Sequence, residues 1–240
     1  MSAPRFYHPE NLEKVQEVCL SLGESHHLVK VLRIRNGENI ELVNGKGIVA
    51  VGHVIDAHAT RSKVLISEWR KEASFPGIHL CFGFPKGLAL DFIFRRCAEI
   101  GVDSFQPLTT EFSLKPGSWN AQRWEKVVVE VCKQCEATFF PKILAPANFT
   151  EWLSRRDNRR LLIVCDDKER AIAASIPRNE WGYDLLIGPE GGWSPRERES
   201  IYRAGAKRFG LGPQRLRSET AALVAITLLK NHIYTKRQSV

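Results

Sequence analysis

Two glycine-rich segments near the C-terminal end constrain the fold of this chain more than any other feature. The first covers residues 185–195 and reads LLIGPEGGWSP, and the second covers residues 211–221 and reads LGPQRLRSETA. Each follows a short apolar run and precedes a helical pattern. Ligands of open α/β sheets bind outside the carboxyl ends of the strands. We therefore expect two parallel strands to end side by side and to present both glycine-rich backbones at one sheet edge.

The C-terminal two thirds of the chain alternates between short apolar runs and helical periodicity. Such alternation predicts an α/β fold with a parallel sheet. The first glycine-rich segment leads into a helix with a complete capping box, in which Ser194 is the N-cap, Pro195 fits the first turn and Glu197 closes the box. Ser218 is the predicted N-cap of the last helix. The expected strands are 78–82, 104–108, 161–165, 184–187 and 208–211, and the expected helices include 90–100, 123–136 and 219–232.

The first 73 residues show a different, β-rich pattern. Short β-prone runs occupy residues 40–43, 48–51 and 63–66, and an Asn-Gly pair between the first two favours a hairpin. A short helix is expected over 24–32, with Leu28, Val31 and Leu32 on one face. Several short strands of this kind predict a small barrel. We therefore expect two domains, residues 1–73 and residues 74–240.

Charge and hydropathy narrow the class of protein. The 240 residues include 35 Lys and Arg against 27 Asp and Glu, which gives a net charge of +8. A basic chain favours a polyanionic partner such as nucleic acid, with affinity that falls as salt rises. The N-terminus lacks the apolar segment of a signal peptide, and the longest apolar stretch, 221–229, is too short to span a bilayer. We expect a soluble, cytoplasmic protein with no membrane partner.

The six cysteines do not form a disulfide framework. Cys132 and Cys135 make a CxxC, but a zinc site would need a second pair or histidines at ligand spacing. Cys132 also continues the apolar face of the valines at 127–129 and 131. Both cysteines are therefore predicted to belong to a helix core, and no metal is expected.

The glycine-rich loops match neither common nucleotide motif. No GK[ST] follows the glycines, and GxGxxG with a distant acidic residue is missing. Bare backbone could instead bind an adenine edge between apolar walls, which suits an adenosine ligand without a polyphosphate. The walls would be Leu186, Ile187, Leu211 and Leu216, and the bare backbone Gly188, Gly191, Gly192 and Gly212.

Four charged residues of the loops have two interpretations each. Glu190 could orient a substrate or cap a helix N-terminus, and Glu219 could act as a base or complement the helix dipole. Arg215 and Arg217 could hold a phosphate or a developing base anion, or could form a solvated basic loop. The residues alone leave these alternatives open.

The two loops resemble the signature of the ribosomal small subunit methyltransferase E family, which belongs to the SPOUT superfamily of knotted methyltransferases. That family has a GPEGG loop after a strand, here 188–192, and an LG-x-x-x-LR-[ST]-ET-A loop before the last helix, here 211–221. The resemblance extends over nearly the whole chain. Further matches are PRFY at 4–7, HHLVKVLR at 26–33, Lys86-Gly87, AEIGV at 98–102, Gln134-Cys135 and PKI at 141–143.

The resemblance implies methylation of N3 of one uridine in 16S ribosomal RNA, with S-adenosylmethionine as the methyl donor. It also implies a PUA-like RNA-holding barrel, an α/β trefoil-knot domain, a homodimer, and action within the 30S subunit. The implied cofactor-binding residues are Leu186, Ile187, Gly188, Pro189, Glu190, Gly191, Gly192, Leu211, Gly212, Leu216, Ser218 and Thr220. The implied catalytic residues are Arg217, Glu219 and Glu190. The implied RNA-binding residues are Arg5, Lys30, Arg33, Arg35, Lys86 and Arg215.

Two departures from the family pattern remove positive charge. Ala89 stands where a second lysine is usual, and Ala137 lies near the place of a usual arginine. They motivate an alternative hypothesis, a catalytically weakened RNA-binding or ribosome-assembly factor with the same fold. A third hypothesis is an adenosine-ligand enzyme that acts on a small molecule.

Overall fold

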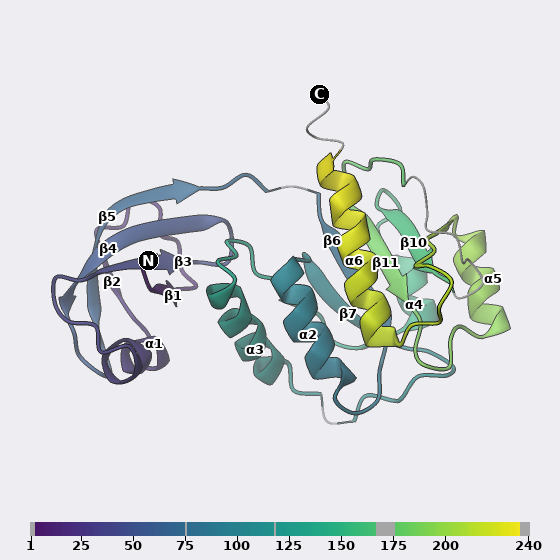
Figure 1. The fold of residues 1–240 in the computed structure, drawn as a ribbon, viewed down its shortest axis with the longest axis horizontal. Helices are drawn as coiled ribbons and strands as arrows, with labels where there is room; N and C mark the ends of the chain where they lie inside the picture. The colour runs from purple at the N-terminus through teal and green to yellow at the C-terminus, as the bar shows by residue number, and fades with distance from the viewer. Residues whose placement is uncertain (1–2, 75, 118, 167–175, 236–240) are drawn as a thin grey trace. The chain divides into compact units, whose positions relative to one another are not determined.

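The computed structural model describes residues 3–74, 76–117, 119–166 and 176–235 (Figure 1). The chain divides into two compact units. Unit 1 comprises Met1–Phe75 and Val129–Phe140, and unit 2 comprises Pro76–Val128 and Pro141–Val240. Each unit has its own sheet.

The sheet of unit 1 has five strands in the order β1-β3-β4-β5-β2. They are β1 (Arg5–Tyr7), β2 (Glu17–Cys19), β3 (Asn39–Val43), β4 (Ile48–Asp56) and β5 (Lys63–Lys71). Strands β1 and β3 are parallel, and the other pairs are antiparallel. The sheet is a curled half-barrel with β1 and β2 at its edges, and the predicted fold class of this small β-rich domain is confirmed. The three predicted strands are confirmed, and two of them continue beyond the predicted end.

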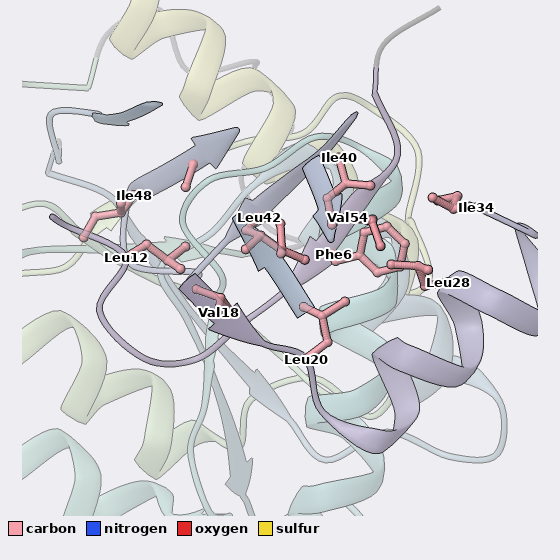
Figure 2. Packing of buried hydrophobic residues seen from close by; sticks show 12 residues of the cluster. Phe6, Leu12, Val18, Leu20, Leu28, Ile34, Ile40, Leu42, Ile48 and Val54 are labelled. Atoms are coloured by element: carbon pink, nitrogen blue, oxygen red, sulfur yellow. The ribbon is translucent and has the colours of Figure 1, made fainter. Parts of the chain in front are cut away.

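The core of unit 1 lies in the hollow of this sheet. Figure 2 shows Phe6, Leu42 and Val54 directed toward a common centre, and all three are fully buried. Leu28 closes the cluster from the helical segment, which consists of α1 (Leu22–His26) and a π-helical turn η1 (His27–Val31).

The predicted helix over 24–32 is therefore only partly correct. Leu28 is buried, but the residues Val31 and Leu32 are 60% and 43% exposed. A π-helical turn is wider than an α-helical one, so it rotates the residues that follow away from the face that a regular helix would give them. The expected apolar face over Leu28, Val31 and Leu32 is wrong for this reason.

The CxxC pair also differs from expectation. Cys132 is buried in α3 (Ala121–Gln134), as predicted, but Cys135 lies beyond the end of the helix and is exposed. Neither cysteine forms a disulfide within the described residues, and the Cys135 thiol donates to the Cys132 carbonyl oxygen. The prediction of a helix-core cysteine is thus right for Cys132 and wrong for Cys135, because the helix ends one residue too early.

The sheet of unit 2 is entirely parallel. Its order is β12-β10-β11-β6-β7-β8, and β9 also pairs with β7. The strands are β6 (Ile78–Gly83), β7 (Ser104–Thr109), β8 (Lys142–Ile143), β9 (Ala147–Asn148), β10 (Leu161–Cys165), β11 (Tyr183–Ile187) and β12 (Lys207–Arg208). The helices besides α3 are α2 (Ala89–Ile100), α4 (Phe149–Arg155), α5 (Pro195–Arg203) and α6 (Ser218–Thr235).

Helices cover this sheet on both faces. Helices α2 and α6 pack side by side, and α6 contacts β6 and β11 (Figure 1). Alternate side chains of the strands enter a second cluster with Phe149 of α4 and Ile201 of α5. Coverage of both faces explains why the strands are continuous apolar runs rather than alternating ones. The predicted α/β class is confirmed, whereas the trefoil knot stays a prediction.

The two strands that lead into the glycine-rich segments are not neighbours. Strand β10 lies between β11 and β12 and pairs with both. Strand β12 is also shorter than the predicted 208–211, although the Phe209 N–H still donates to the Val164 carbonyl. The expectation of two adjacent strand ends is thus wrong, and the end of β10 lies between the two loops.

Within the described ranges, every helix is too short or too polar to cross a bilayer.

Candidate functional site

A cavity of about 540 Å³ opens at the carboxyl edge of the unit 2 sheet. Both glycine-rich segments line it, together with the end of β10. Its lining residues are Cys165, Asp166, Ile187, Gly188, Pro189, Glu190, Gly192, Trp193, Arg198, Leu211, Gly212, Pro213, Gln214, Arg215, Leu216, Arg217, Ser218 and Ala221. Loops after parallel strands converge at such an edge because all the strands point the same way.

The first loop follows β11 and is fixed at its far end by α5. Ser194 caps that helix, since its hydroxyl accepts from the Glu197 N–H, and the Glu197 carboxylate accepts from the Ser194 N–H at 3.0 Å. The other carboxylate oxygen of Glu197 accepts from the Glu111 N–H at 2.9 Å. The predicted capping box is confirmed, and its hydrogen bonds fix the backbone where the loop enters α5.

Two glycines of the lining hold conformations that L-residues rarely adopt. Gly192 has φ +74° and Gly212 has φ +109°, and a Cβ at either position would meet nothing within 4 Å. Glycine is therefore needed at both for the backbone path rather than for space. Each loop consequently turns with its backbone bare toward the cavity.

Glu190 joins this loop to the segment after β6. Its Oε1 accepts a hydrogen bond from the Lys86 N–H at 3.0 Å, and its carbonyl oxygen accepts from Arg215 Nη2 at 3.3 Å. The second contact links the two glycine-rich loops directly. Glu190 thus lines the cavity at the point where three segments meet.

A buried acid lies at the β10 side of the cavity. The Asp166 carboxylate accepts hydrogen bonds from the Arg198 guanidinium and from the Tyr202 hydroxyl. Burial raises the pKa of Tyr202, and the bond to Asp166 raises it further. Burial alone would lower the pKa of Arg198, but Asp166 outweighs this effect and the net pKa is raised. Asp166 and Arg198 form a salt bridge, in which the Asp166 side chain is only 1% exposed.

Trp193 forms part of the cavity wall. The ring is buried and packs against Phe149, with ring centroids 5.2 Å apart. Its Nε1 lies 3.2 Å from the position that a Cβ on Gly188 would take, and it has no hydrogen-bond partner among the described residues. A buried, unpartnered N–H is costly, which marks this wall as a place where a ligand could bring an acceptor.

Most of the predicted cofactor-binding and catalytic residues line this cavity, but four of them do not. Leu186 is fully buried in the core cluster behind the site. Gly191 faces Phe112, whose Cβ lies 2.8 Å from the Cβ position of that glycine. Glu219 and Thr220 belong to the first turn of α6, and Glu219 accepts from the Ser218 hydroxyl at 3.3 Å. Since α6 begins at Ser218, this serine starts the helix rather than preceding it.

The predicted RNA-binding residues fall in both units. In unit 1, Lys30, Arg33 and Arg35 are exposed. Arg5 is different, because its guanidinium donates twice to Glu41 Oε2, at 2.7 and 3.0 Å, and its side chain is only 8% exposed. In unit 2, Lys86 and Arg215 are exposed, and Arg215 lines the cavity.

Three prominent lining residues are not among those predicted from the sequence: Asp166, Trp193 and Arg198. Asp166 directly follows a predicted strand, so its place at the carboxyl edge could have been inferred from that strand's end. Trp193 directly follows the glycine pair. Arg198 is one helical turn beyond the N-cap Ser194, and no sequence motif marks it.

Comparisons with known proteins agree with this architecture. A model described as an RNA methyltransferase domain matches residues 71–230, and one described as an RNA methyltransferase PUA domain matches residues 23–67. Two relatives, each called ribosomal RNA small subunit methyltransferase E, are 30% identical. The Synechocystis protein aligns over 87% of this chain and 71% of its own length, and the Buchnera aphidicola (Acyrthosiphon pisum) protein over 95% and 92%.

A solved structure is also similar over nearly the full length. It is the ribosomal RNA small subunit methyltransferase E from Neisseria gonorrhoeae, bound to S-adenosyl methionine. The identity is 28% and the TM-score 0.88, with 96% of this chain and 98% of that chain covered.

Proposed function

Because this chain belongs to the ribosomal RNA small subunit methyltransferase E family, we propose that it transfers a methyl group from S-adenosylmethionine to N3 of a uridine in 16S ribosomal RNA. We propose U1498 as the target nucleotide. The cavity between the two glycine-rich loops carries this proposal.

The residues of the cavity fit S-adenosylmethionine. The volume of about 540 Å³ lies within the roughly 300–1,000 Å³ that small-molecule sites occupy. Ile187, Leu211 and Leu216 offer apolar walls for an adenine ring, and the backbone turns at Gly192 and Gly212 leave peptide groups accessible to its edge. The unpartnered Nε1 of Trp193 could donate to a ligand acceptor. When bound, the cofactor would supply an electrophilic methyl group on a positively charged sulfur.

Uracil N3 carries a proton and is a poor nucleophile until that proton leaves. We propose Glu190 as the base that takes it, because Glu190 lines the cavity and its carboxylate is fixed by the Lys86 N–H. The N3 lone pair then bonds to the methyl carbon as the bond from that carbon to sulfur breaks. We assign no catalytic role to Glu219, which does not line the cavity.

Arg217 is proposed to stabilise the negative charge that develops on the uracil oxygens. It is exposed and lines the cavity on the second loop. A guanidinium aimed at developing charge stabilises the transition state more than the ground state. Its neighbour Arg215 donates to the Glu190 carbonyl, which fixes the spacing between the proposed base and the second loop.

RNA would be held by exposed basic residues of both units. In unit 1 we propose Lys30, Arg33 and Arg35, and in unit 2 Lys86 and Arg215. Arg5 is left out of this set because Glu41 occupies its guanidinium. We further propose residues 1–73 as the RNA-holding domain and residues 74–240 as the methyltransferase domain.

We also propose a homodimer, as the family resemblance implies. Helix α6 is apolar around most of its circumference, and Leu223, Val224 and Leu228 stay only half-buried. A helix with this pattern usually packs on more than one side. Light scattering of the purified protein tests this point, with a monomer at micromolar concentration as the contradicting result.

The function is tested by incubating the protein with labelled S-adenosylmethionine and either 30S subunits or 16S RNA that lack the modification. The expected result is label in the RNA, recovered as N3-methyluridine. RNA binding without methyl transfer would favour the alternative, a catalytically weakened assembly factor. Cofactor binding with no RNA affinity would favour an enzyme that acts on a small molecule.

A further inference from the structure

The β10 side of the cavity contains a charge cluster that the proposed reaction does not use. Asp166 follows β10 and has a side chain only 1% exposed. Arg198 and Tyr202, one turn apart on the same face of α5, both donate to its carboxylate. The ring of Tyr202 lies under the guanidinium of Arg208, whose Cζ is 4.5 Å from the ring centroid. The cluster therefore connects β10, α5 and β12.

This cluster faces the cavity rather than only the protein interior. Asp166 and Arg198 are both lining residues, and the Arg198 side chain is 18% exposed. The buried carboxylate determines how the guanidinium is oriented. A planar guanidinium can hold a carboxylate through two parallel N–H bonds, and it does so more strongly where water is scarce.

The other charged residues of the cavity are placed differently. Arg215 and Arg217 are exposed residues of the second loop, and Glu190 is an exposed residue of the first. Among the charged side chains that line the cavity in the described ranges, Arg198 is the cation anchored to a buried acid. Such an anchored cation suits a fixed ligand anion, whereas exposed loop cations suit a mobile RNA strand.

We infer that Arg198, oriented by Asp166, binds the α-carboxylate at the amino-acid end of S-adenosylmethionine. This inference rests on the proposed function, and it makes Asp166 a positioning residue. The adenosine end would lie between the two glycine-rich loops, and the carboxylate would lie toward β10. The cavity would then select ligands that carry an amino-acid group over otherwise identical ones without it.

The test compares S-adenosylmethionine with decarboxylated S-adenosylmethionine, which differs only in the missing carboxylate. Both dissociation constants are measured by calorimetry on the full chain. The wild type should bind the decarboxylated ligand about tenfold to hundredfold more weakly, as expected for one lost charge-assisted interaction. Arg198→Gln should weaken S-adenosylmethionine by a similar factor and should bind the two ligands within about threefold of each other. Asp166→Asn should reduce the discrimination in the same direction.

Two further variants keep the result interpretable. Arg203→Gln removes an exposed arginine of the same helix, outside the cavity, and should leave the discrimination unchanged. If thermal denaturation shows that Arg198→Gln is not folded, Arg198→Lys replaces it. Lysine keeps the charge but lacks the paired N–H donors of a guanidinium, so this variant should discriminate between the two ligands less than the wild type does. Equal binding of both ligands by the wild type, or full discrimination by the folded Arg198 variants, would overturn the inference. A wild type that binds neither ligand would instead overturn the proposed function itself.

Discussion

The Oε1 atom of Glu190 lies 3.0 Å from the backbone nitrogen of Lys86 and accepts its hydrogen bond, although the two residues are 104 positions apart in the chain. The contact ties the first glycine-rich loop to the segment after β6. This hydrogen bond fixes one carboxylate oxygen in position and leaves the other oxygen available to accept a proton. The sequence alone does not distinguish Glu190 from Glu219 as a candidate base. In the structure Glu190 lines the cavity and Glu219 does not.

Glu190→Gln should lower kcat by about 10²–10⁴, the usual contribution of a positioned general base. The amide oxygen can still accept from the Lys86 N–H, so the loop should keep its position and the affinity for S-adenosylmethionine should change by less than about threefold. Single-turnover methyl transfer and calorimetry measure the two effects. Glu219→Gln is the matched control, with kcat expected within about threefold of the wild type. The opposite ranking of the two variants would reject Glu190 as the base.

Arg217→Gln should lower kcat by about 10²–10³, because a donor aimed at developing charge acts mainly in the transition state. Arg215→Gln should instead raise KM for RNA with kcat nearly unchanged, since that side chain bridges the two loops and is one of the residues we propose to bind RNA. Steady-state kinetics on 30S subunits separate the two patterns. A loss of kcat for Arg215→Gln alone would show that the roles of the two arginines are reversed.

Gly212→Ala should weaken cofactor binding and lower the free energy of unfolding by about 1–3 kcal/mol, because φ +109° strains any residue with a Cβ. Calorimetry and urea unfolding measure the two quantities. Gly23→Ala is the control, since Gly23 lies in α1 with ordinary φ and open space around its Cβ position. Alanine there should be neutral or stabilising by about 0.5–1 kcal/mol. Equal effects at both sites would contradict the account of the loop.

Asp184→Asn should destabilise the protein by about 3–5 kcal/mol, because two buried guanidiniums would lose their shared carboxylate. Arg156 Nε and Arg160 Nε lie 3.1 and 2.9 Å from its two oxygens. Burial alone would raise the pKa of Asp184, but hydrogen bonds from His79 and Arg160 and the arginine charges outweigh it, and the net pKa is lowered.

This lowered pKa fixes the pH dependence of the effect. The stabilisation is fully present above the unfolded-state pKa of about 3.9, and it is lost as the pH falls through the folded-state value. Urea unfolding of the wild type between neutral and acid pH should therefore show a steeper loss of stability than Asp184→Asn shows. Asp91→Asn removes an exposed partner of Arg95 and should change stability by less than about 1 kcal/mol at any pH. Parallel pH curves for wild type and Asp184→Asn would contradict this prediction.

Lys30→Ala combined with Arg35→Ala should weaken RNA binding and make it less dependent on salt. Each lost phosphate contact lowers the magnitude of the slope of log K against log salt by about 0.7–0.9. Filter binding to 16S RNA at several salt concentrations measures the slope, and S-adenosylmethionine affinity should not change. Lys71→Ala is the control, because Lys71 already pairs with Glu13 at 2.8 Å. An unchanged slope for the double variant would show that Lys30 and Arg35 do not contact RNA phosphates.

Local chemistry made much of the fold predictable from the sequence. The strand 161–165 matches β10 residue for residue, and the capping box at Ser194 is present as predicted. Both depend on neighbouring residues in the chain, where hydrophobic runs and capping hydrogen bonds are encoded directly.

The features that were not predictable depend on contacts distant in sequence. The insertion of β10 between β11 and β12 is a matter of strand order, which no local pattern encodes. For the same reason Asp166 and Arg198, 32 positions apart, could not be recognised as a pair. The exposure of Val31 and Leu32 follows from one π-helical turn, which periodicity does not reveal. The sequence therefore predicted the two loops of the site but not the end of β10, which lies between them.

Mass spectrometry of 16S ribosomal RNA nucleosides, from cells with and without this protein, tests the central claim most directly. The account predicts N3-methyluridine in the first RNA, its loss from the second, and its return when the wild type but not Glu190→Gln is supplied at equal abundance. Undiminished N3-methyluridine in cells without the protein would contradict it.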